Sequence, residues 1–459
     1  MLSKTLIKDV LGRALSSGGD FAEIFVEDKI SNNLSMIDGK MERIVSGRDF
    51  GVGIRIFKGF RSIYVYCNDS SRSSLLECAE KAASALGSIT SDISINLTER
   101  INPNIHPVLY VPSSVENSRK IKVIKKANDA AKNYSEEIAQ VLVNYIDWDQ
   151  KVLIANSEGL LTEDRRVRTR LMIKSVASNG VENQTGSEGP GAAKGFELFE
   201  YVDPEYYGRE ASRSAVTMLH ARNCPAGRMT VAIENGFGGV IFHEACGHSL
   251  EATAVAKGNS VFAGKLGQKI ASDKLTAVDD GTEPGQWGSL NIDDEGTPTR
   301  KNILIENGIL KSYMIDKLNG RRMGMESTGS GRRQSYRYAP TSRMTNTYIA
   351  PGEDSNEDII ASISEGLYAK KMGGGSVNPV TGEFNFAVAE GYLVKNGIIQ
   401  EPVRGASLIG KGADILMKID MVGKDLACGQ GMCGSVSGSI PTNVGQPLIR
   451  VYEITVGGR

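Results

Sequence analysis

The segment from Ile241 to Leu250 holds half of the four histidines of this chain and a carboxylate beside one of them. His243 and His248 lie five residues apart, and Glu244 directly follows the first histidine. A neutral imidazole is a good ligand for zinc, and a carboxylate next to it can act on a metal-bound water. Metal-assisted hydrolysis is therefore the leading hypothesis for this segment.

The spacing of the two histidines differs from that of the helical zinc proteases. Those enzymes use H-E-x-x-H, in which a step of roughly 400° leaves both imidazoles on one helix face. The H-E-x-x-x-H of this chain turns roughly 500°, which leaves the two side chains about 140° apart in a regular α-helix. Both rings can reach one ion only if the backbone departs from α geometry, as in a π-type turn, and Gly247 suits such a departure. The alternative is a helix with one buried and one exposed histidine.

Two histidines do not complete a zinc site, which needs a third protein ligand and an open position for water. The other histidines are poor candidates, because His106 stands beside a proline in an expected loop and His220 ends an expected helix. A cysteine or a carboxylate must then supply the third ligand.

The cysteine candidates are Cys246, inside the motif, and Cys428 and Cys433, in a segment that we interpret as a glycine-rich turn. Thiolates on such loops bind soft-to-borderline ions well. The alternative for each single cysteine is a small buried hydrophobic side chain. The residues by themselves do not choose among the three.

Composition bounds the class of protein. The chain has 459 residues, enough for two or three domains, with 40% apolar and 23% charged residues, as in globular proteins. A net charge of −1 gives no reason to expect nucleic acid or an anionic membrane as a partner. The N-terminus lacks the apolar core of a signal peptide, and no stretch is long enough to span a membrane. Six scattered cysteines indicate a reducing, cytoplasmic location.

The first part of the chain is typical of an α/β module. We expect helices over 4–17, 71–86, 114–133 and 204–220, and strands over 21–26, 33–37, 41–45, 51–57, 61–66, 138–145, 151–155 and 160–176. The lysines of the 114–133 helix are expected to form a solvated face. The alternating arginines between Arg165 and Arg170 are expected on the exposed side of a strand.

The second part has mostly strand and turn character around one catalytic helix. That helix is expected to run from about Phe237 to Ala254, after a strand over 229–233, and further strands are expected over 302–306, 309–315, 384–395, 398–403 and 448–456. The fold class is therefore α+β, with an N-terminal α/β module of antiparallel strands and long helices and a C-terminal β-rich module carrying the catalytic helix. We place the domains at 1–215 and 216–459.

Other charged segments have ordinary explanations. Asp279-Asp280 and Asp293-Asp294-Glu295 miss the spacing of a calcium loop, so solvated turns are expected. The arginine-rich stretch 332–343 could contact RNA, a substrate carboxylate or a subunit interface, and nucleic acid ranks last.

Four ordered blocks resemble the TldD side of the TldD/PmbA metalloprotease family. They are F-H-E-A-C-G-H-S-L-E-A at 242–252, I-D-D-E-G-T-P-T at 292–299, R-M-T-N-T at 343–347, and Cys433-Gly434 followed by V-G-Q-P at 444–447. The blocks span most of the chain beyond Gly236. The first half resembles the first domain of the family in pattern only.

The resemblance implies roles for four residues. His243, His248 and Cys433 would bind one zinc ion per catalytic subunit, and Glu244 would be the general base; Cys428 does not correspond to a family ligand. The implied activity is zinc metallopeptidase action on unfolded or partly degraded polypeptides, through a metal-activated water.

The resemblance also implies an assembly. Family members form dimers, either with themselves or with a PmbA/TldE-type paralogue that lacks the H-E-x-x-x-H motif, so this chain resembles the catalytic member. No nucleic acid and no membrane are expected as partners. The alternative function is a non-catalytic binding or regulatory protein, in line with the description of family members as gyrase modulators. A weaker alternative is a zinc-dependent amidase acting on a modified peptide or small amide.

Overall fold

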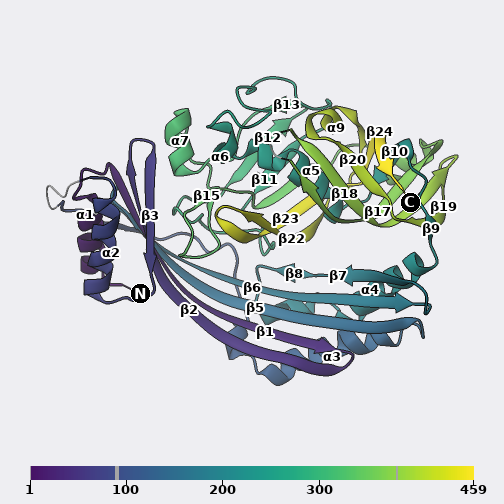
Figure 1. The fold of residues 1–459 in the computed structure, drawn as a ribbon, viewed down its shortest axis with the longest axis horizontal. Helices are drawn as coiled ribbons and strands as arrows, with labels where there is room; N and C mark the ends of the chain where they lie inside the picture. The colour runs from purple at the N-terminus through teal and green to yellow at the C-terminus, as the bar shows by residue number, and fades with distance from the viewer. Residues whose placement is uncertain (1, 88–92, 379–380, 459) are drawn as a thin grey trace.

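The computed structural model describes residues 2–87, 93–378 and 381–458, and its α+β architecture confirms the predicted fold class. A long curved sheet from the first half of the chain lies under a β-rich second half (Figure 1). None of the helices in these residues is long and apolar enough to cross a membrane.

The N-terminal sheet is built from very long strands. Over the described residues its order is β3-β2-β1-β5-β6-β4, and β7 and β8 pair with β6. The strands are β1 Phe21–Ile37, β2 Lys40–Lys58, β3 Arg61–Cys67, β4 Thr98–Arg100, β5 Ile138–Asn156, β6 Leu160–Ser178, β7 Asn183–Glu188 and β8 Gly191–Ala192.

The prediction of short strands was wrong for β1, β2 and β5, each of which covers two predicted strands, whereas β3 and β6 lie close to their predicted bounds. β1 continues through both of its predicted strands, because the polar residues between them pair on both sides, as Asn32 does with Ser46 and Asp147. The Asn32 Nδ2 donates to Asp147 Oδ1 at 2.6 Å, which satisfies a polar side chain inside the sheet. The polar residues at this point pair with polar residues of the adjacent strands, and the strand continues through them.

The two faces of the sheet have different partners. In β1, Ile24 and Val26 pack with α1 and α2, while Leu34 and Met36 pack with α3 and α4. These even-numbered side chains share one face because successive side chains alternate along a strand. The odd-numbered ones, among them Phe25, turn towards the second half of the chain.

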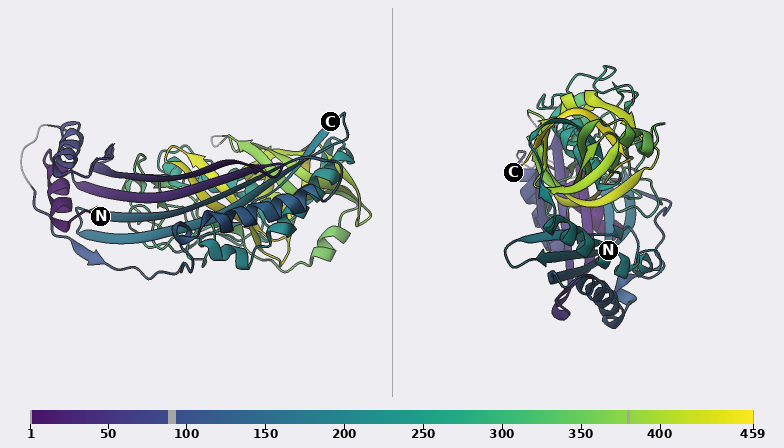
Figure 2. Two further views of the ribbon diagram at one scale, coloured as in Figure 1. Left: turned by 90° about the horizontal axis from the view of Figure 1, so that it is seen from below. Right: turned by 90° about the vertical axis from the view of Figure 1, so that its right-hand side faces the viewer.

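The helices cover the two ends of one face of the sheet (Figures 1 and 2). They are α1 Lys4–Leu15, α2 Arg72–Ser84, α3 Asn117–Lys132 and α4 Pro204–Leu219, with the 3-10 turns η1 Pro112–Ser114 and η2 Phe196–Glu200. The predicted lysine face of α3 is exposed at Lys122, Lys125 and Lys126, but Lys120 is buried and pairs with Asp147 at 2.7 Å. The predicted boundary at residue 215 falls within α4 and stays a prediction.

The second half contains two further large sheets and one two-stranded sheet in the described residues. One large sheet has the order β17-β10-β24-β20-β18-β19-β9, is joined by β21, and closes on itself because β17 also pairs with β18. Viewed from its end, this sheet forms a ring (Figure 2, right). Its strands are β9 Arg222–Asn223, β10 Gly227–Ile233, β17 Glu365–Val377, β18 Glu383–Lys395, β19 Ile398–Arg404, β20 Ser407–Lys411, β21 Ile419–Val422 and β24 Ile449–Gly457.

The other large sheet has the order β13-β12-β11-β16-β23-β22, which leaves β22 at an edge. Its strands are β11 Ala277–Asp280, β12 Lys301–Glu306, β13 Ile309–Leu310, β16 Asn346–Ile349, β22 Ala427–Ser435 and β23 Gly438–Gln446; β14 Gly331–Arg332 pairs separately with β15 Thr341–Ser342. The remaining helices outside the motif are α7 Lys317–Met323, α8 Asn356–Ala361 and α9 Gly412–Lys418.

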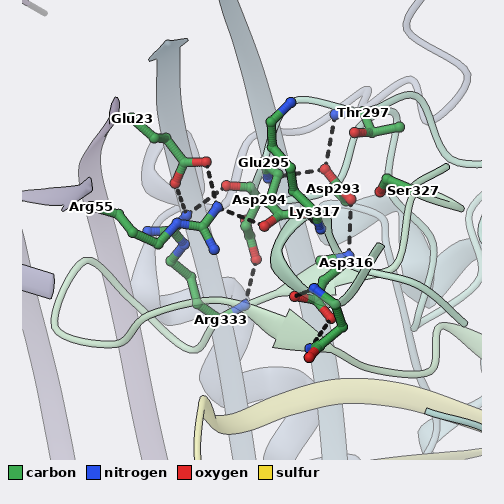
Figure 3. A network of polar contacts seen from close by, with 12 residues as sticks. Glu23, Arg55, Asp293, Asp294, Glu295, Thr297, Asp316, Lys317, Ser327 and Arg333 are labelled. Carbon is green, nitrogen blue, oxygen red and sulfur yellow. Dashed lines mark hydrogen bonds and ion pairs between the residues drawn. The ribbon is translucent and has the colours of Figure 1, made fainter. Parts of the chain in front are cut away.

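Buried ion pairs join the first sheet to loops of the second half (Figure 3). Arg55 of β2 lies between Glu23 of β1, at 2.8 Å, and Glu295, at 2.6 Å. Arg333 pairs with Glu23 and also donates its backbone amide to Asp294 Oδ2 at 2.7 Å. All five residues are buried, so the prediction of a solvated turn at 293–295 was wrong. Charges that were expected to face water are compensated here by the opposite half of the chain.

The predicted exposure of the arginines in β6 was also wrong in part. Arg166 and Arg168 are buried against the second half, whereas Arg165 is exposed. Arg168 donates to the carbonyl oxygens of Trp287 and Ser289, both at 2.7 Å. The predicted alternation of side chains along the strand was correct. The face with Arg166 and Arg168, which was expected to be exposed to water, instead packs against the second half of the chain.

Candidate metal centre

The H-E-x-x-x-H segment is a broken helix. The 3-10 turn η3, Phe237–Gly239, leads into α5, Val240–Ala245, and the 3-10 turn η4, Gly247–Leu250, leads into the short α6, Ala252–Val255. Cys246 lies at the break, with φ −129° and ψ −47°. Its amide still donates to Phe242 O at 3.0 Å, but the next bond runs from Ser249 N to Cys246 O over three residues. The predicted continuous helix from Phe237 to Ala254 was therefore wrong. The departure from α geometry occurs where it was expected, as a 3-10 turn and not as the π-type turn given as an example.

The break brings the two imidazoles together. The ring centroids of His243 and His248 are 5.0 Å apart, with an interplanar angle of 81°. The Sγ of Cys433 lies 3.3 Å from the Nε2 atom of each histidine. Donor atoms of the three residues all lie within 4.8 Å of one another. Two segments far apart in the sequence thus form one cluster.

Cys433 reaches the cluster from a strand and not from the predicted glycine-rich turn. It belongs to β22, pairs with Ile440 of β23, and is 7% exposed. Its neighbour Met432 is 49% exposed, because successive side chains of a strand point to opposite faces. The two-stranded hairpin of β22 and β23, called here the cysteine hairpin, fixes the thiol opposite the helix break.

The cluster fits a zinc ion in spacing and in chemistry. Zinc bonds of roughly 2.0–2.1 Å to nitrogen and 2.3 Å to sulfur, at tetrahedral angles, place the two ligand atoms about 3.5 Å apart. The observed separation of 3.3 Å is close to this value. Two imidazoles and a thiolate form a donor set that zinc accepts.

Electrostatics favours the thiolate form of Cys433. Burial by itself raises the pKa of this thiol, but hydrogen bonds and charge from His243 and His248 outweigh burial and lower the pKa to about 4. Burial likewise lowers the pKa of His248, while the nearby charge of Glu251 and the contact with Cys433 raise it well above its usual value. The thiolate is the form of cysteine that binds a metal ion.

Two carboxylates flank His248. Glu244 Oε2 lies 3.7 Å from Nε2, on the side of the ring that faces Cys433, and its side chain is 27% exposed. Glu251 Oε2 lies 3.2 Å from Nδ1, on the opposite side of the ring. A carboxylate in that position fixes the orientation and tautomer of a metal-binding imidazole. Glu251 was not among the predicted site residues, although its position three residues after His248 is a usable signal.

Arg343 was missed as well. It is fully buried, and its Nη1 donates to Ser437 Oγ and Gly438 O, both at 2.9 Å, while Nη2 donates to Cys433 O. Its Nε lies 3.9 Å from Glu251 Oε1. Arg343 thus connects the cysteine hairpin with the carboxylate that holds His248. None of the three partners expected for the 332–343 stretch is needed to explain this arginine.

The other candidate ligands lie elsewhere. His106 is buried in the first half, and His220 pairs with Glu137 at 2.9 Å. Cys246 is fully buried in the apolar core, and burial raises the pKa of its thiol. Burial also raises the pKa of Cys428 to about 11. Within the described residues, the group of possible metal donors contains neither of these cysteines.

A cleft of about 830 Å³ lies between the two halves of the molecule. Residues of β6 and β7 line one side, and residues of β17 and β22 line the other. The β22 wall at Cys428–Gln430 continues along the same strand to Cys433. The lining of the cleft does not include His243, Glu244, His248 or Cys433.

Two imidazoles and a thiolate beside a carboxylate, held in a β-rich module, have the composition of a catalytic zinc site, which has three protein ligands and an open position for water. Sequence comparison agrees. The PmbA/TldA metallopeptidase C-terminal domain matches residues 226–458, the central domain matches 110–219, and domain 1 matches 22–86. The chain belongs to the PmbA/TldD metallopeptidase family, which confirms the resemblance seen in its motifs.

Relatives cover nearly the whole chain. A protein named metalloprotease TldD homolog from Haemophilus influenzae is 37% identical over 96% of this chain and 93% of its own length. A metalloprotease from Methanothermobacter thermautotrophicus is 34% identical over 98% and 99%, respectively. A zinc metalloprotease TldD homolog from Saccharolobus solfataricus is 27% identical over 97% and 98%.

Solved structures share the fold. A protein from Thermotoga maritima described as a modulator of a DNA gyrase superposes with a TM-score of 0.80 at 22% identity, covering 99% of this chain and all of that one. TldE from Thermococcus kodakarensis gives a TM-score of 0.77 at 20% identity, with the same coverage. At these identities the likeness concerns the fold alone.

Proposed function

We propose that this chain is a zinc metallopeptidase that hydrolyses peptide bonds of unfolded or partly degraded polypeptides. The observation that carries the proposal is the convergence of His243, His248 and Cys433 within 4.8 Å, beside Glu244. The metallopeptidase family and the zinc in the name of the Saccharolobus solfataricus relative support it.

His243, His248 and Cys433 would hold the zinc ion. When bound, zinc would polarise a peptide carbonyl and lower the pKa of a water molecule. Glu244 is the general base: its carboxylate takes a proton from water and returns it to the leaving amine. Its partial exposure leaves it open to the solvent that must supply the water. Glu251 and Arg343 keep His248 and Cys433 in place.

The substrate would bind as an extended strand. β22 is an edge strand that carries Cys433, and an edge strand can pair with the backbone of a peptide. Backbone pairing gives weak sequence selectivity and requires an unfolded chain. Efficient cleavage of intact folded proteins would count against this mode of binding.

The assembly would be a dimer, formed with a second copy or with a PmbA/TldE-type paralogue. This pairing is what the family resemblance of the motifs implies, and membership of the family supports it. The six free cysteines support a cytoplasmic location.

The test measures zinc and cleavage together. Elemental analysis of the purified chain should give about one zinc per catalytic subunit, and casein-like unfolded peptides should be cleaved until a chelator is added. Glu244→Gln should keep the zinc and lower the cleavage rate by about 10²–10⁴-fold. Glu353→Gln, on an exposed side chain far from the cluster in sequence, is the matched control and should cleave normally.

Two results would contradict the proposal. Cleavage by Glu244→Gln at the normal rate would remove Glu244 from its role. A zinc-loaded protein that cleaves no unfolded peptide would favour a binding or regulatory protein instead.

A further inference from the structure

A second cavity, of about 200 Å³, lies between the N-terminal sheet and the cysteine hairpin. Met432 lines it while the next residue, Cys433, does not, so the cavity lies on the face of β22 that points away from the metal centre. Its lining includes five cationic side chains: Lys29 of β1, Arg166 and Arg168 of β6, and Arg332 and Arg333. The four arginines are at most 7% exposed.

Two of these arginines have carboxylate partners. Arg166 pairs with Asp164 at 3.1 Å and with Asp294, and Arg333 pairs with Glu23. Of these three carboxylates, only Asp294 lines the cavity. The charges of Arg166 and Arg333 are therefore largely compensated by these ion pairs, which join the two halves of the chain.

The other two arginines have only backbone partners. Arg168 donates through Nε and Nη2 to the carbonyl oxygens of Trp287 and Ser289. Arg332 donates to the carbonyl oxygens of Met344 and Pro441. Among the residues that the structure describes, neither forms an ion pair, and Arg168 Nη1 and Arg332 Nε have no acceptor. Two buried guanidinium groups thus face one cavity without an ion pair of their own, although the charge of Asp294, which is paired with Arg166, also acts on both.

Lys29 adds a third cation. Its Nζ lies 4.8 Å from the centroid of the Trp148 ring and has no hydrogen bond or ion pair in the described part of the chain. The nearby carboxylate of Glu27 is occupied, because it accepts from Gln150 Nε2 and from Tyr336 N, both at 2.8 Å.

The pKa values of these three cations, which face the cavity, are all lowered. Burial, together with the charges of Arg332 and Arg166, lowers the pKa of Arg168 to about 9. Burial also lowers the pKa of Arg332 to about 10 and lowers the pKa of Lys29. A buried charge without a partner is costly, and an anion is the group that would remove this cost.

We propose that this cavity is an anion-binding site for a small oxyanion, a carboxylate or a phosphate group, held by Arg168, Arg332 and Lys29. The planar guanidinium presents paired N–H donors that match two oxygens of such a group. A volume of about 200 Å³ holds the group together with several waters, since each water occupies about 30 Å³.

The bound anion would link both halves of the molecule to the cysteine hairpin. Arg332 donates to Pro441 O, and Pro441 is the β23 residue paired with Met432 of β22. Lys29 and Arg168 belong to the N-terminal sheet. Anion binding would therefore fasten the strand that carries Cys433 from its other face, and it needs no metal ion.

The test measures binding of inorganic phosphate and of succinate by titration calorimetry, with chloride at the same ionic strength as the reference. The full chain is used both after chelator treatment and after zinc loading, so that a failure here is separate from a failure of the peptidase proposal. We expect saturable binding of at least one probe, one per chain, in both preparations, and a higher midpoint of thermal unfolding than in chloride. The probe with the lower Kd shows whether the site prefers a phosphate group or a carboxylate.

Two variants locate the site. Lys29→Gln should weaken binding about tenfold or more. Its unfolding midpoint in chloride should change little, because Lys29 Nζ lies over the Trp148 ring and forms no hydrogen bond or ion pair within the described residues. Arg168→Gln should weaken binding further. Lys122→Gln, on the exposed face of α3, is the matched control and should bind normally. The proposal is overturned if neither probe binds above the chloride reference, or if Lys29→Gln binds as tightly as the unaltered chain.

Discussion

Cys433 is the donor in the cluster that comes from outside the histidine segment, so the closing of the site depends on this one side chain. Cys433→Ala should reduce the zinc content from about one ion per chain to nearly none, because two imidazoles leave a zinc site one protein ligand short. The fold should persist, since the cysteine hairpin is held by its backbone pairing. Elemental analysis with circular dichroism checks both statements.

The matched control is Cys428→Ala, in the same strand but outside the cluster. It should leave the zinc content unchanged. Unchanged zinc in Cys433→Ala would instead assign the third ligand to Cys246, Cys428 or a carboxylate.

The histidine pair and Glu244 could be identified from the sequence because their chemistry is local. Cys433 could not be chosen from the residues alone, since its distance from His243 along the chain carries no spacing rule; only the family motif singled it out. Glu251 and Arg343 act through contacts that form after folding. Their roles depend on partners that no local pattern specifies.

The break in the catalytic helix depends on the absence of a side chain at Gly247. A Cβ there would lie 2.4 Å from the Sδ of Met344, which is fully buried. Gly247→Ala should therefore lower the free energy of unfolding by about 1–3 kcal/mol through overpacking. Urea unfolding measures this loss, and Gly227→Ala, whose added Cβ meets no atom within 4 Å, is the control.

A double variant tests the cause of that loss. Met344→Ala opens the space into which the new methyl group would project, so Gly247→Ala should cost less in its presence than alone. Strictly additive losses would mean that the clash with Met344 is not what makes glycine necessary at this position.

The cysteine hairpin is held against the broken helix by Arg343. Arg343→Met should weaken zinc binding about 10–100-fold, because it frees both the hairpin and the carboxylate that orients His248. Arg343→Lys should recover only part of the affinity, since an ammonium group cannot reproduce the forked contacts of a guanidinium. Chelator competition measures the affinity, and the absorption spectrum of the cobalt-substituted protein reports the geometry at the metal. An Arg343→Met variant with unchanged affinity and spectrum would limit Arg343 to a structural role.

At the level of elements, the sequence predicts the four long helices and about half of the strands well, but it divides each of the long strands β1, β2 and β5 into two. The helix predicted over 204–220 is observed as Pro204–Leu219, because its apolar spacing and its Asp203 cap are local signals. β22 was taken for a turn because five of its nine residues are glycine or cysteine. Its pairing with β23 decides its conformation, and that pairing is not visible in its own residues.

Across the whole molecule, buried charge is what the sequence predicts least well. The carboxylates at 293–295 and the arginines of β6 have the sequence pattern of solvent-exposed residues. In the structure the three carboxylates, Arg166 and Arg168 are buried between the two halves of the chain. Charged residues are almost never fully buried unless they are paired, so the sequence pattern pointed to water. The partner that changes this outcome lies more than a hundred residues away.

The ion pair between Glu390 and Arg213, which also joins the two halves of the chain, is expected to make the stability of the fold sensitive to acid. Glu390 of β18 accepts hydrogen bonds from Arg213 of α4, at 2.9 Å, and from Tyr392, at 2.8 Å. Burial raises the pKa of Glu390, but these contacts outweigh burial and lower it from 4.5 to about 2. A lowered pKa stabilises the folded state above about pH 4.5, and this contribution is lost as the pH falls towards 2.

Glu390→Gln should therefore flatten the fall in stability between about pH 4.5 and pH 2, by at most about 3 kcal/mol. Urea unfolding at a series of pH values checks this, with Glu353→Gln as the control that keeps the full slope. An unaltered slope in Glu390→Gln would assign the acid sensitivity to other carboxylates.

The break at Cys246 also bears on how enzymes of this kind can arise. Deleting one residue between the histidines would restore the familiar H-E-x-x-H pattern, yet it would remove the turn that lets the two rings face each other. The two motifs are therefore separated by an insertion and by a different backbone path, and no series of point substitutions converts one into the other. A sequence search that tolerates substitutions but not gaps would pass over this site.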